Sequence, residues 1–181
     1  ALGCSPGDRV ALLSKNCAEW VIADLAIMLA GLISVPLYPL QSAESINYVL
    51  HHSQCKAIFL GKLDEPAKLE PGITPELIRI AMPYPTIKAE HGWHALLAAH
   101  APLLDAHVQS ADALLSILYT SGTTGQPKGV MLSAKAFAYA GSQSVKELQI
   151  TEQDQYFSYL PLSHAAERFL VEMNALYSGG R

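Results

Sequence analysis

Apolar residues in the N-terminal third of the chain recur in alternating short and long groups. The short groups predict strands from Asp8 to Ser14, from Ile33 to Tyr38 and from Lys56 to Leu60. The long groups predict a helix from Cys17 to Leu32, followed by one that begins at Ser42 or Ser45 and runs through His52. Because such alternation is typical of α/β proteins, we expect a mostly parallel sheet flanked by helices.

The rest of the chain begins irregularly and then returns to the same alternation. Residues 61–90 are rich in proline, which predicts loops with one strand from Leu77 to Met82. The further elements that we expect are the helix Gly92–Ala99, the strands Leu114–Thr120, Val130–Ser133 and Tyr156–Leu160, and the helices Phe137–Leu148 and Ala165–Tyr177. One apolar stripe with helical spacing is predicted to be core: Trp20, Val21, Ile22, Leu25 and Met28.

The composition is that of a protein with a large core. Of the 181 residues, 50% are hydrophobic and 15% are charged, against roughly 25% charged in an average domain. The net charge of −4, without a basic stripe, argues against nucleic acid as a partner. The longest apolar stretch, from Val21 to Val35, contains Asp24 and is shorter than the ~20 residues that span a bilayer. These features exclude disorder and argue against a membrane-spanning helix.

Cysteine and histidine spacing does not predict a metal or redox site. Three cysteines without a CxxC pair are expected to be free thiols, which suits a reducing cytoplasm. His91 and His94 have HxxH spacing, but a metal site needs three or four converging ligands, and this segment resembles a surface helix.

The ends of the chain suggest a piece of a longer protein. It opens at Ala1 without an initiator Met and stops at Arg181 directly after an apolar helical pattern. Elements that would pack on a missing portion leave apolar surface uncovered, so we expect the isolated chain to self-associate or to form a homodimer.

The segment between the strands that end at Thr120 and begin at Val130 has the composition of a phosphate-binding loop. It reads Thr-Ser-Gly-Thr-Thr-Gly-Gln-Pro-Lys-Gly from Thr120 to Gly129. Glycines let backbone amides approach an anion, hydroxyls donate to phosphoryl oxygens or ligate Mg²⁺, and lysine adds a positive charge. It is not the usual P-loop, because Pro127 precedes Lys128 and a strand, not a helix, follows. A flexible linker would not be expected to place such a corner between apolar strands.

The run YTSGTTGQPKG, from Tyr119 to Gly129, resembles the phosphate-binding motif of the adenylate-forming superfamily of acyl-CoA synthetases, peptide-synthetase adenylation domains and luciferases. The segment from Met28 to Leu50 is similar to the stretch upstream of that motif. LPLSHAAER, from Leu160 to Arg168, resembles the LPLxHxxER segment of long-chain fatty-acid CoA ligases. The resemblance identifies residues 1–181 as part of the large N-terminal AMP-binding domain, without its C-terminal portion and lid domain.

The resemblance implies a two-step reaction. A fatty-acid carboxylate attacks ATP to give acyl-adenylate and pyrophosphate, and the CoA thiol then displaces AMP. It also implies that Thr120 helps to ligate Mg²⁺ and that the β- and γ-phosphates are held by these residues: Ser121, Gly122, Thr123, Thr124, Gly125 and Lys128. The adenine and ribose segments, the hinge and a C-terminal catalytic lysine would lie beyond Arg181, so the fragment alone is expected not to make acyl-AMP.

His164 matches a family histidine near the acyl and adenylate site, and the alternative is a partly buried structural imidazole bonded to backbone. Glu167 and Arg168 follow within one helical turn and are interpreted as a local, structural ion-pair network. Two other functions stay open: a ligase for another carboxylate, such as an aryl or amino acid, and a non-catalytic nucleotide-binding module. We expect a cytoplasmic protein. A fatty-acid substrate would also be consistent with peripheral contact with a membrane.

Overall fold

The computed structural model describes residues 2–102, 107–120 and 125–181 and contains a seven-stranded sheet with the strand order β5-β4-β3-β1-β2-β6-β7. β6 and β7 pair antiparallel, and the other pairings are parallel. The strands are β1 (Arg9–Leu13), β2 (Ile33–Leu37), β3 (Cys55–Leu60), β4 (Ile78–Ala81), β5 (His91–Gly92), β6 (Leu114–Thr120) and β7 (Lys128–Ser133). The α/β class and the mostly parallel sheet are therefore confirmed.

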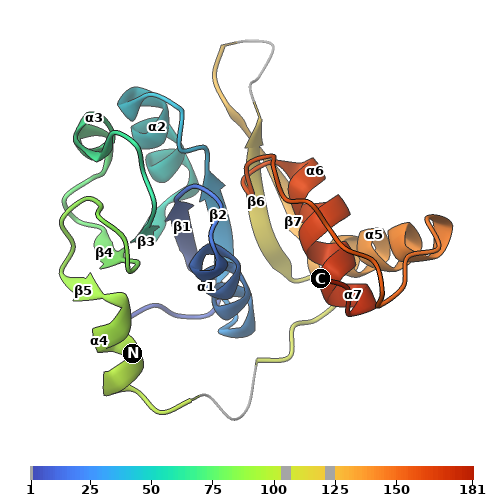
Figure 1. Ribbon diagram of the computed structural model, residues 1–181. Helices are drawn as coiled ribbons and strands as arrows, with labels where there is room; N and C mark the ends of the chain where they lie inside the picture. The colour runs from blue at the N-terminus through green and yellow to red at the C-terminus, as the bar shows by residue number, and fades with distance from the viewer. Residues whose placement is uncertain (1, 103–106, 121–124) are drawn as a thin grey trace.

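Helices lie on both faces of this sheet (Figure 1). They are α1 (Ala18–Leu29), α2 (Ala43–Ser53), α3 (Pro66–Leu69), a 3₁₀ turn (Glu70–Gly72), α4 (Trp93–Ala99), α5 (Ala134–Glu147), α6 (Ala165–Glu167), a π-helical segment (Arg168–Met173) and α7 (Asn174–Ser178). Ser42 begins α2 as predicted, since its side chain accepts a hydrogen bond from the Ser45 N–H at 3.2 Å.

The alternating side chains of β1 separate two cores. Ala11 and Leu13 pack with α2, whereas Val10 and Leu12 pack with Trp20 of α1. Both pairs are buried because the central strands are covered on both faces, which explains the apolar composition of the chain.

The hairpin β6–β7 lies between the parallel strands and the helices α5–α7 (Figure 1). Its register pairs Thr120 with Lys128 and Tyr119 with Gly129. β2 and β6 share one described ladder pair, Ser34 with Ser116. Pro36, two residues further along β2, has no N–H with which to continue a ladder. The hairpin is therefore joined to the parallel part of the sheet over a short length.

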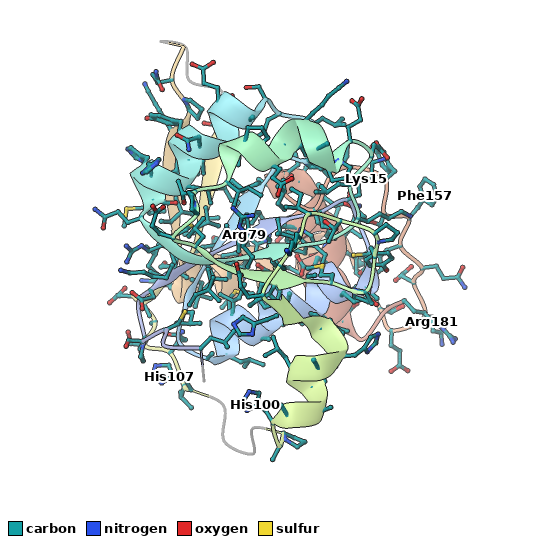
Figure 2. All side chains as sticks on the ribbon, turned by 90° about the vertical axis from the view of Figure 1, so that its left-hand side faces the viewer. Lys15, Arg79, His100, His107, Phe157 and Arg181 are labelled. Carbon is teal, nitrogen blue, oxygen red and sulfur yellow. The ribbon has the colours of Figure 1, made fainter. Side chains whose placement is uncertain are left out.

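Two predicted elements are wrong in detail. Residues 156–160 form no strand. The Tyr156 N–H donates to the Arg181 carbonyl at 2.8 Å, the Leu160 N–H donates to the Glu167 side chain, and the Leu160 carbonyl accepts from the Asn16 side chain. Phe157 is 81% exposed and lies at the periphery of the molecule in Figure 2. The predicted helix from Ala165 to Tyr177 forms, but a π-helical segment interrupts it between α6 and α7.

The predicted core stripe of α1 is also only partly correct. Trp20 and Met28 are buried, but Ile22 is 54% exposed because it faces away from the sheet. Within the described residues, no helix has the length and apolar character to cross a membrane.

Candidate functional site

The antiparallel hairpin places the two ends of the phosphate-loop motif side by side. Thr120 ends β6, Lys128 begins β7, and the two residues are directly opposite. Side chains of such a pair point to the same face of a sheet, and both residues are exposed. Ser121, Gly122, Thr123 and Thr124 lie outside the described residues. The hydroxyl of Thr120 and the ammonium of Lys128 thus flank the base of the loop.

Two glycines of the motif have distinct structural reasons. Gly125 has φ +91°, a conformation that side chains rarely adopt, and the space where a Cβ would stand is open. At Gly129 a Cβ would lie 2.8 Å from Ile117 Cγ2 and 3.2 Å from Tyr119 Cζ. Gly125 leaves room for a ligand, whereas Gly129 allows β7 to pack closely on β6.

A pocket of about 530 Å³ opens beside the loop. It is lined by Tyr38, Gln41, Ser45, Tyr119, Thr120, Gly125, Pro127 and His164. Three of the predicted site residues, Thr120, Gly125 and His164, therefore line one cavity. Lys128 does not line it but is the next residue after Pro127, which does. The wall formed by Tyr38, Gln41 and Ser45 was missed by the sequence analysis. Tyr38 ends a predicted strand, and the other two lie within seven residues after it, at the end of a strand where ligands of parallel sheets bind.

His164 is exposed, which differs from the partial burial in the alternative, but the ring is bonded to backbone as that alternative expects. It caps α6: its Nδ1 accepts a hydrogen bond from the Ala166 N–H at 3.1 Å. An accepting Nδ1 in a neutral imidazole assigns the proton to Nε2, so the other ring nitrogen is a hydrogen-bond donor. The ring also lies 6.5 Å from the Tyr38 ring, edge to face.

Tyr119 connects the pocket to α2. Its hydroxyl is 2.7 Å from His52 Nδ1, and the His52 ring stacks on Tyr48 at 5.4 Å. Burial raises the pKa of Tyr119 to about 12, so its hydroxyl stays protonated at neutral pH.

The segment that leads to His164 is held by the side chain of Asn16, which is distant in sequence, and by that of Glu167, which follows in α6. Asn16 donates to the Leu160 carbonyl at 2.7 Å and accepts from the Leu162 N–H at 2.9 Å. Glu167 accepts from the Leu160 N–H at 3.2 Å. The loop from Leu160 to His164 is therefore anchored to the end of β1 and to α6.

Arg168 is fully buried, and its partners correct the interpretation of a local ion-pair network. Its guanidinium pairs with the equally buried Asp24 of α1 and donates to Ser116 Oγ of β6 at 2.7 Å. Ser34 Oγ also donates to Asp24. Glu172 follows Arg168 by four residues, and its Oε2 lies 3.6 Å from Arg168 Nε. Sequence spacing shows only the Glu172 contact, because Asp24 is brought there by tertiary folding.

Glu172 is the second carboxyl beside this guanidinium. Burial is the main cause that raises the pKa of Glu172 from 4.5 to about 8, and the charge of Asp24 raises it further, while Arg168 lowers it. Burial and the neighbouring carboxylate therefore favour the protonated form of Glu172.

We expect the raised pKa of Glu172 to make stability depend on pH. The folded protein holds this proton more tightly than the unfolded chain, so the free energy of unfolding falls as pH rises from about 5 to about 8. The substitution Glu172→Gln should remove that fall and exceed the wild type at pH 8 by a few kcal/mol. Urea denaturation at pH 5 and pH 8 measures both. Glu147→Gln, at the exposed end of α5, is the control; a wild-type pH dependence unchanged by Glu172→Gln would contradict the prediction.

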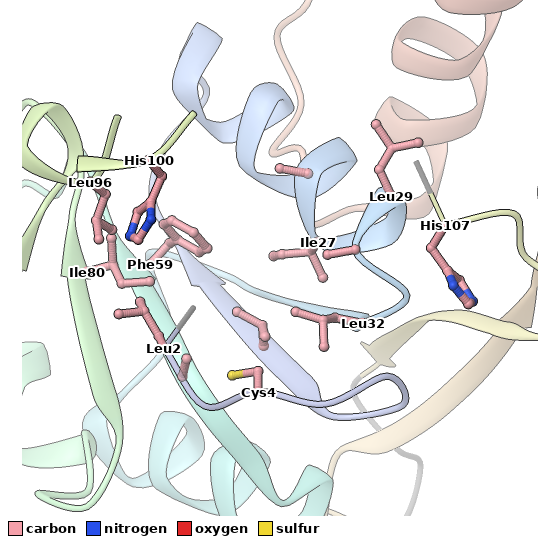
Figure 3. Close-up of a pocket in the computed structure, with 14 residues that line it drawn as sticks. Leu2, Cys4, Ile27, Leu29, Leu32, Phe59, Ile80, Leu96, His100 and His107 are labelled. Carbon is pink, nitrogen blue, oxygen red and sulfur yellow. The ribbon is translucent and has the colours of Figure 1, made fainter. Parts of the chain in front are cut away.

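A larger, apolar pocket of about 750 Å³ lies between α1, α4 and the N-terminal segment, away from the phosphate loop (Figure 3). Cys4, Ile27, Phe59 and Ile80 line it, and the loop motif contributes no described residue. Among the described residues, no group of three or more His, Cys, Asp or Glu is placed to hold a metal ion. The convergent polar groups are therefore those of the smaller pocket at the loop.

Comparison with known proteins agrees with the motifs. The chain matches the AMP-binding enzyme family over residues 1–181. It is 34% identical to fatty acyl-CoA synthetase A of Dictyostelium discoideum, covering 99% of this chain and 29% of that protein. It is 28% identical to long chain acyl-CoA synthetase 5 of Arabidopsis thaliana, covering 94% of this chain and 28% of that protein. The chain thus spans less than a third of these relatives.

Among solved structures, the anthranilate CoA ligase AuaEII in complex with anthranoyl-AMP has a TM-score of 0.89 and 23% identity over 99% of this chain and 35% of that one. At that identity the likeness concerns the fold. From the family match over the whole chain, it follows that the chain belongs to the AMP-binding enzymes, the adenylate-forming family.

Proposed function

We propose that the protein to which this chain belongs activates a long-chain fatty acid with ATP and transfers it to CoA. The observation that carries this is the pocket where Thr120, Gly125 and His164 meet at the base of the YTSGTTGQPKG hairpin. The fatty-acid preference is supported by LPLSHAAER and by the two acyl-CoA synthetases described above, which match over nearly the whole chain.

The donor set of the hairpin suits a polyphosphate. We propose that Ser121, Gly122, Thr123, Thr124, Gly125 and Lys128 hold the β- and γ-phosphates and that the Thr120 hydroxyl is a ligand of Mg²⁺. The open space over Gly125 and the exposure of Thr120 and Lys128 fit an anion at this place. Bound Mg²⁺ would supply further positive charge to the leaving pyrophosphate. Amides, hydroxyls and the lysine stabilise the same developing charge.

His164 is proposed to contribute to the acyl and adenylate end of the pocket. Its Nδ1 is occupied by the Ala166 N–H, so Nε2–H is the group that can donate to a carboxylate or phosphate oxygen. This assigns the histidine a role in orienting a substrate oxygen, since a ring that donates from Nε2 is not at the same time a base there.

We also propose that residues 1–181 are part of the N-terminal AMP-binding domain of a cytoplasmic ligase. In that case the 181-residue chain alone lacks pyrophosphate exchange, because the adenine, ribose and lid contacts come from other segments. Measurable exchange that depends on ATP and fatty acid in the purified chain would contradict this.

The substrate class is tested on the full-length protein with acids of graded chain length. We expect AMP formation that depends on CoA to rise with chain length and to exceed that with benzoate, anthranilate or amino acids. A preference for an aryl or amino acid would contradict the fatty-acid proposal and identify another carboxylate as the substrate. ATP binding without AMP formation for any acid would support a non-catalytic nucleotide-binding module instead.

A further inference from the structure

The buried network around Arg168 lies at the short junction between β2 and β6. The single described ladder pair of that junction is Ser34 with Ser116, and both residues belong to the network. Ser116 Oγ donates to the Ser34 carbonyl at 2.9 Å, while Asp24 accepts from Ser34 Oγ and from Arg168. Side chains therefore supply polar contacts where the backbone ladder is short.

Two aromatic rings enclose the guanidinium. Its Cζ lies 5.7 Å from the ring centroid of Trp20 in α1 and 5.0 Å from that of Phe137 in α5. A planar cation between two rings and bonded to two elements has one geometry, which a flexible ammonium does not reproduce. Arg168 thus ties α1, β6 and α5 to its own helix.

The same helix and strand carry the candidate site. His164 is one turn before Arg168, whose N–H donates to the His164 carbonyl at 3.2 Å. Thr120 is four residues after Ser116 on β6 and therefore points to the same face of the sheet. Four residues span about 6 Å of helix and about 13 Å of strand. The Arg168–Ser116 bond and the pocket residues His164 and Thr120 therefore involve the same two segments of the chain.

We propose that Arg168, held by Asp24 and Ser116, is a positioning residue that sets where the His164 ring stands relative to Thr120. It acts through His164 and touches no substrate. The inference rests on the proposed function, because it assumes that His164 orients a substrate oxygen during adenylation. Misplacing a reacting group by about 1 Å costs on the order of 10²-fold in rate, so a partial loss of the anchor has a measurable effect.

The first test is Arg168→Lys in the full-length enzyme, which keeps the charge and removes the forked contact to Asp24 and Ser116. We expect kcat for pyrophosphate exchange to fall roughly 10-fold, with KM for ATP within about 2-fold, because the phosphate loop is unchanged. Arg79→Lys is the matched control: this arginine of β4 pairs with Glu70 and is labelled in Figure 2. Equal kcat in both variants, measured where each remains folded, would overturn the proposal.

A double-mutant cycle then separates positioning from general stability. If Arg168 acts through His164, Arg168→Lys lowers the rate in the wild type but not further in His164→Ala. It should lower the melting temperature equally in both backgrounds. If the rate loss of the double variant equals the product of the losses of the two single variants, Arg168 acts independently of His164, and the proposal is overturned.

A measurement without activity keeps the inference separate from the proposed function. In enzyme labelled with ¹³C at histidine Cε1, the His164 signal is identified by its loss in His164→Ala. We expect Arg168→Lys and Asp24→Asn to shift that signal and Arg79→Lys to leave it in place. An unmoved signal overturns the positioning role even in an active enzyme. A moved signal in a protein that activates no acid supports the positional link while rejecting the fatty-acid ligase.

Discussion

Replacing Lys128 by alanine is expected to lower the rate of ATP–pyrophosphate exchange in the full-length enzyme by on the order of 10²-fold or more. Lys128 begins β7 opposite Thr120 and is exposed at the base of the loop, so its charge is available to an anion there. Pyrophosphate gathers negative charge as it leaves, and the loss of a donor that meets this charge affects the transition state more than the ground state. The measurement is exchange of labelled pyrophosphate at saturating fatty acid.

Two further variants make the result specific to this lysine. Lys146→Ala removes an exposed lysine from the last turn of α5 and should leave exchange near that of the wild type. Lys128→Arg keeps the charge but changes its shape, so we expect it to retain part of the rate. Near wild-type exchange in Lys128→Ala would count against the assignment of the loop to the phosphates.

Asp24→Ala is expected to lower the free energy of unfolding by about 3–5 kcal/mol. Asp24 and Arg168 are both fully buried, and removal of the carboxylate leaves a buried guanidinium without its main partner. Combining Asp24→Leu with Arg168→Met should destabilise the protein less than the sum of the single changes, since no unpaired charge remains. Urea denaturation of the single and double variants measures this coupling.

The control for this prediction is an exposed ion pair in the same chain. Lys15 and Asp64 are 2.5 Å apart, with 39% and 59% of their side chains exposed. Water and salt screen such a pair, so Asp64→Ala should change stability by no more than about 1 kcal/mol. Similar losses for Asp24→Ala and Asp64→Ala would show that burial does not make the Asp24–Arg168 pair important.

Periodicity predicted β1, β2, β3 and β4 because each of them is a short, mostly apolar run. It did not predict β5, the two-residue strand His91–Gly92, which has no apolar run and whose Gly92 was expected to begin a helix. The strand from Leu114 to Thr120 was predicted with its observed bounds. The prediction failed at residues 156–160, where a short run of aromatic and apolar residues around Ser158 resembles a strand. The local pattern was suitable, but no neighbouring strand is paired with it, and the side chains of Asn16 and Glu167 bond the backbone of Leu160 instead.

The sequence by itself determined the α/β class, the composition of the phosphate loop and the family to which the chain belongs, because these depend on residues that are adjacent or periodic. Only the tertiary structure decided which residues face the loop and what surrounds Arg168. Tyr38, which directly follows β2, lines the pocket, and Asp24 of α1 pairs with Arg168. Neither contact produces a local sequence pattern. The two residues of each contact come from distant parts of the chain, so the number of residues between them is not constrained.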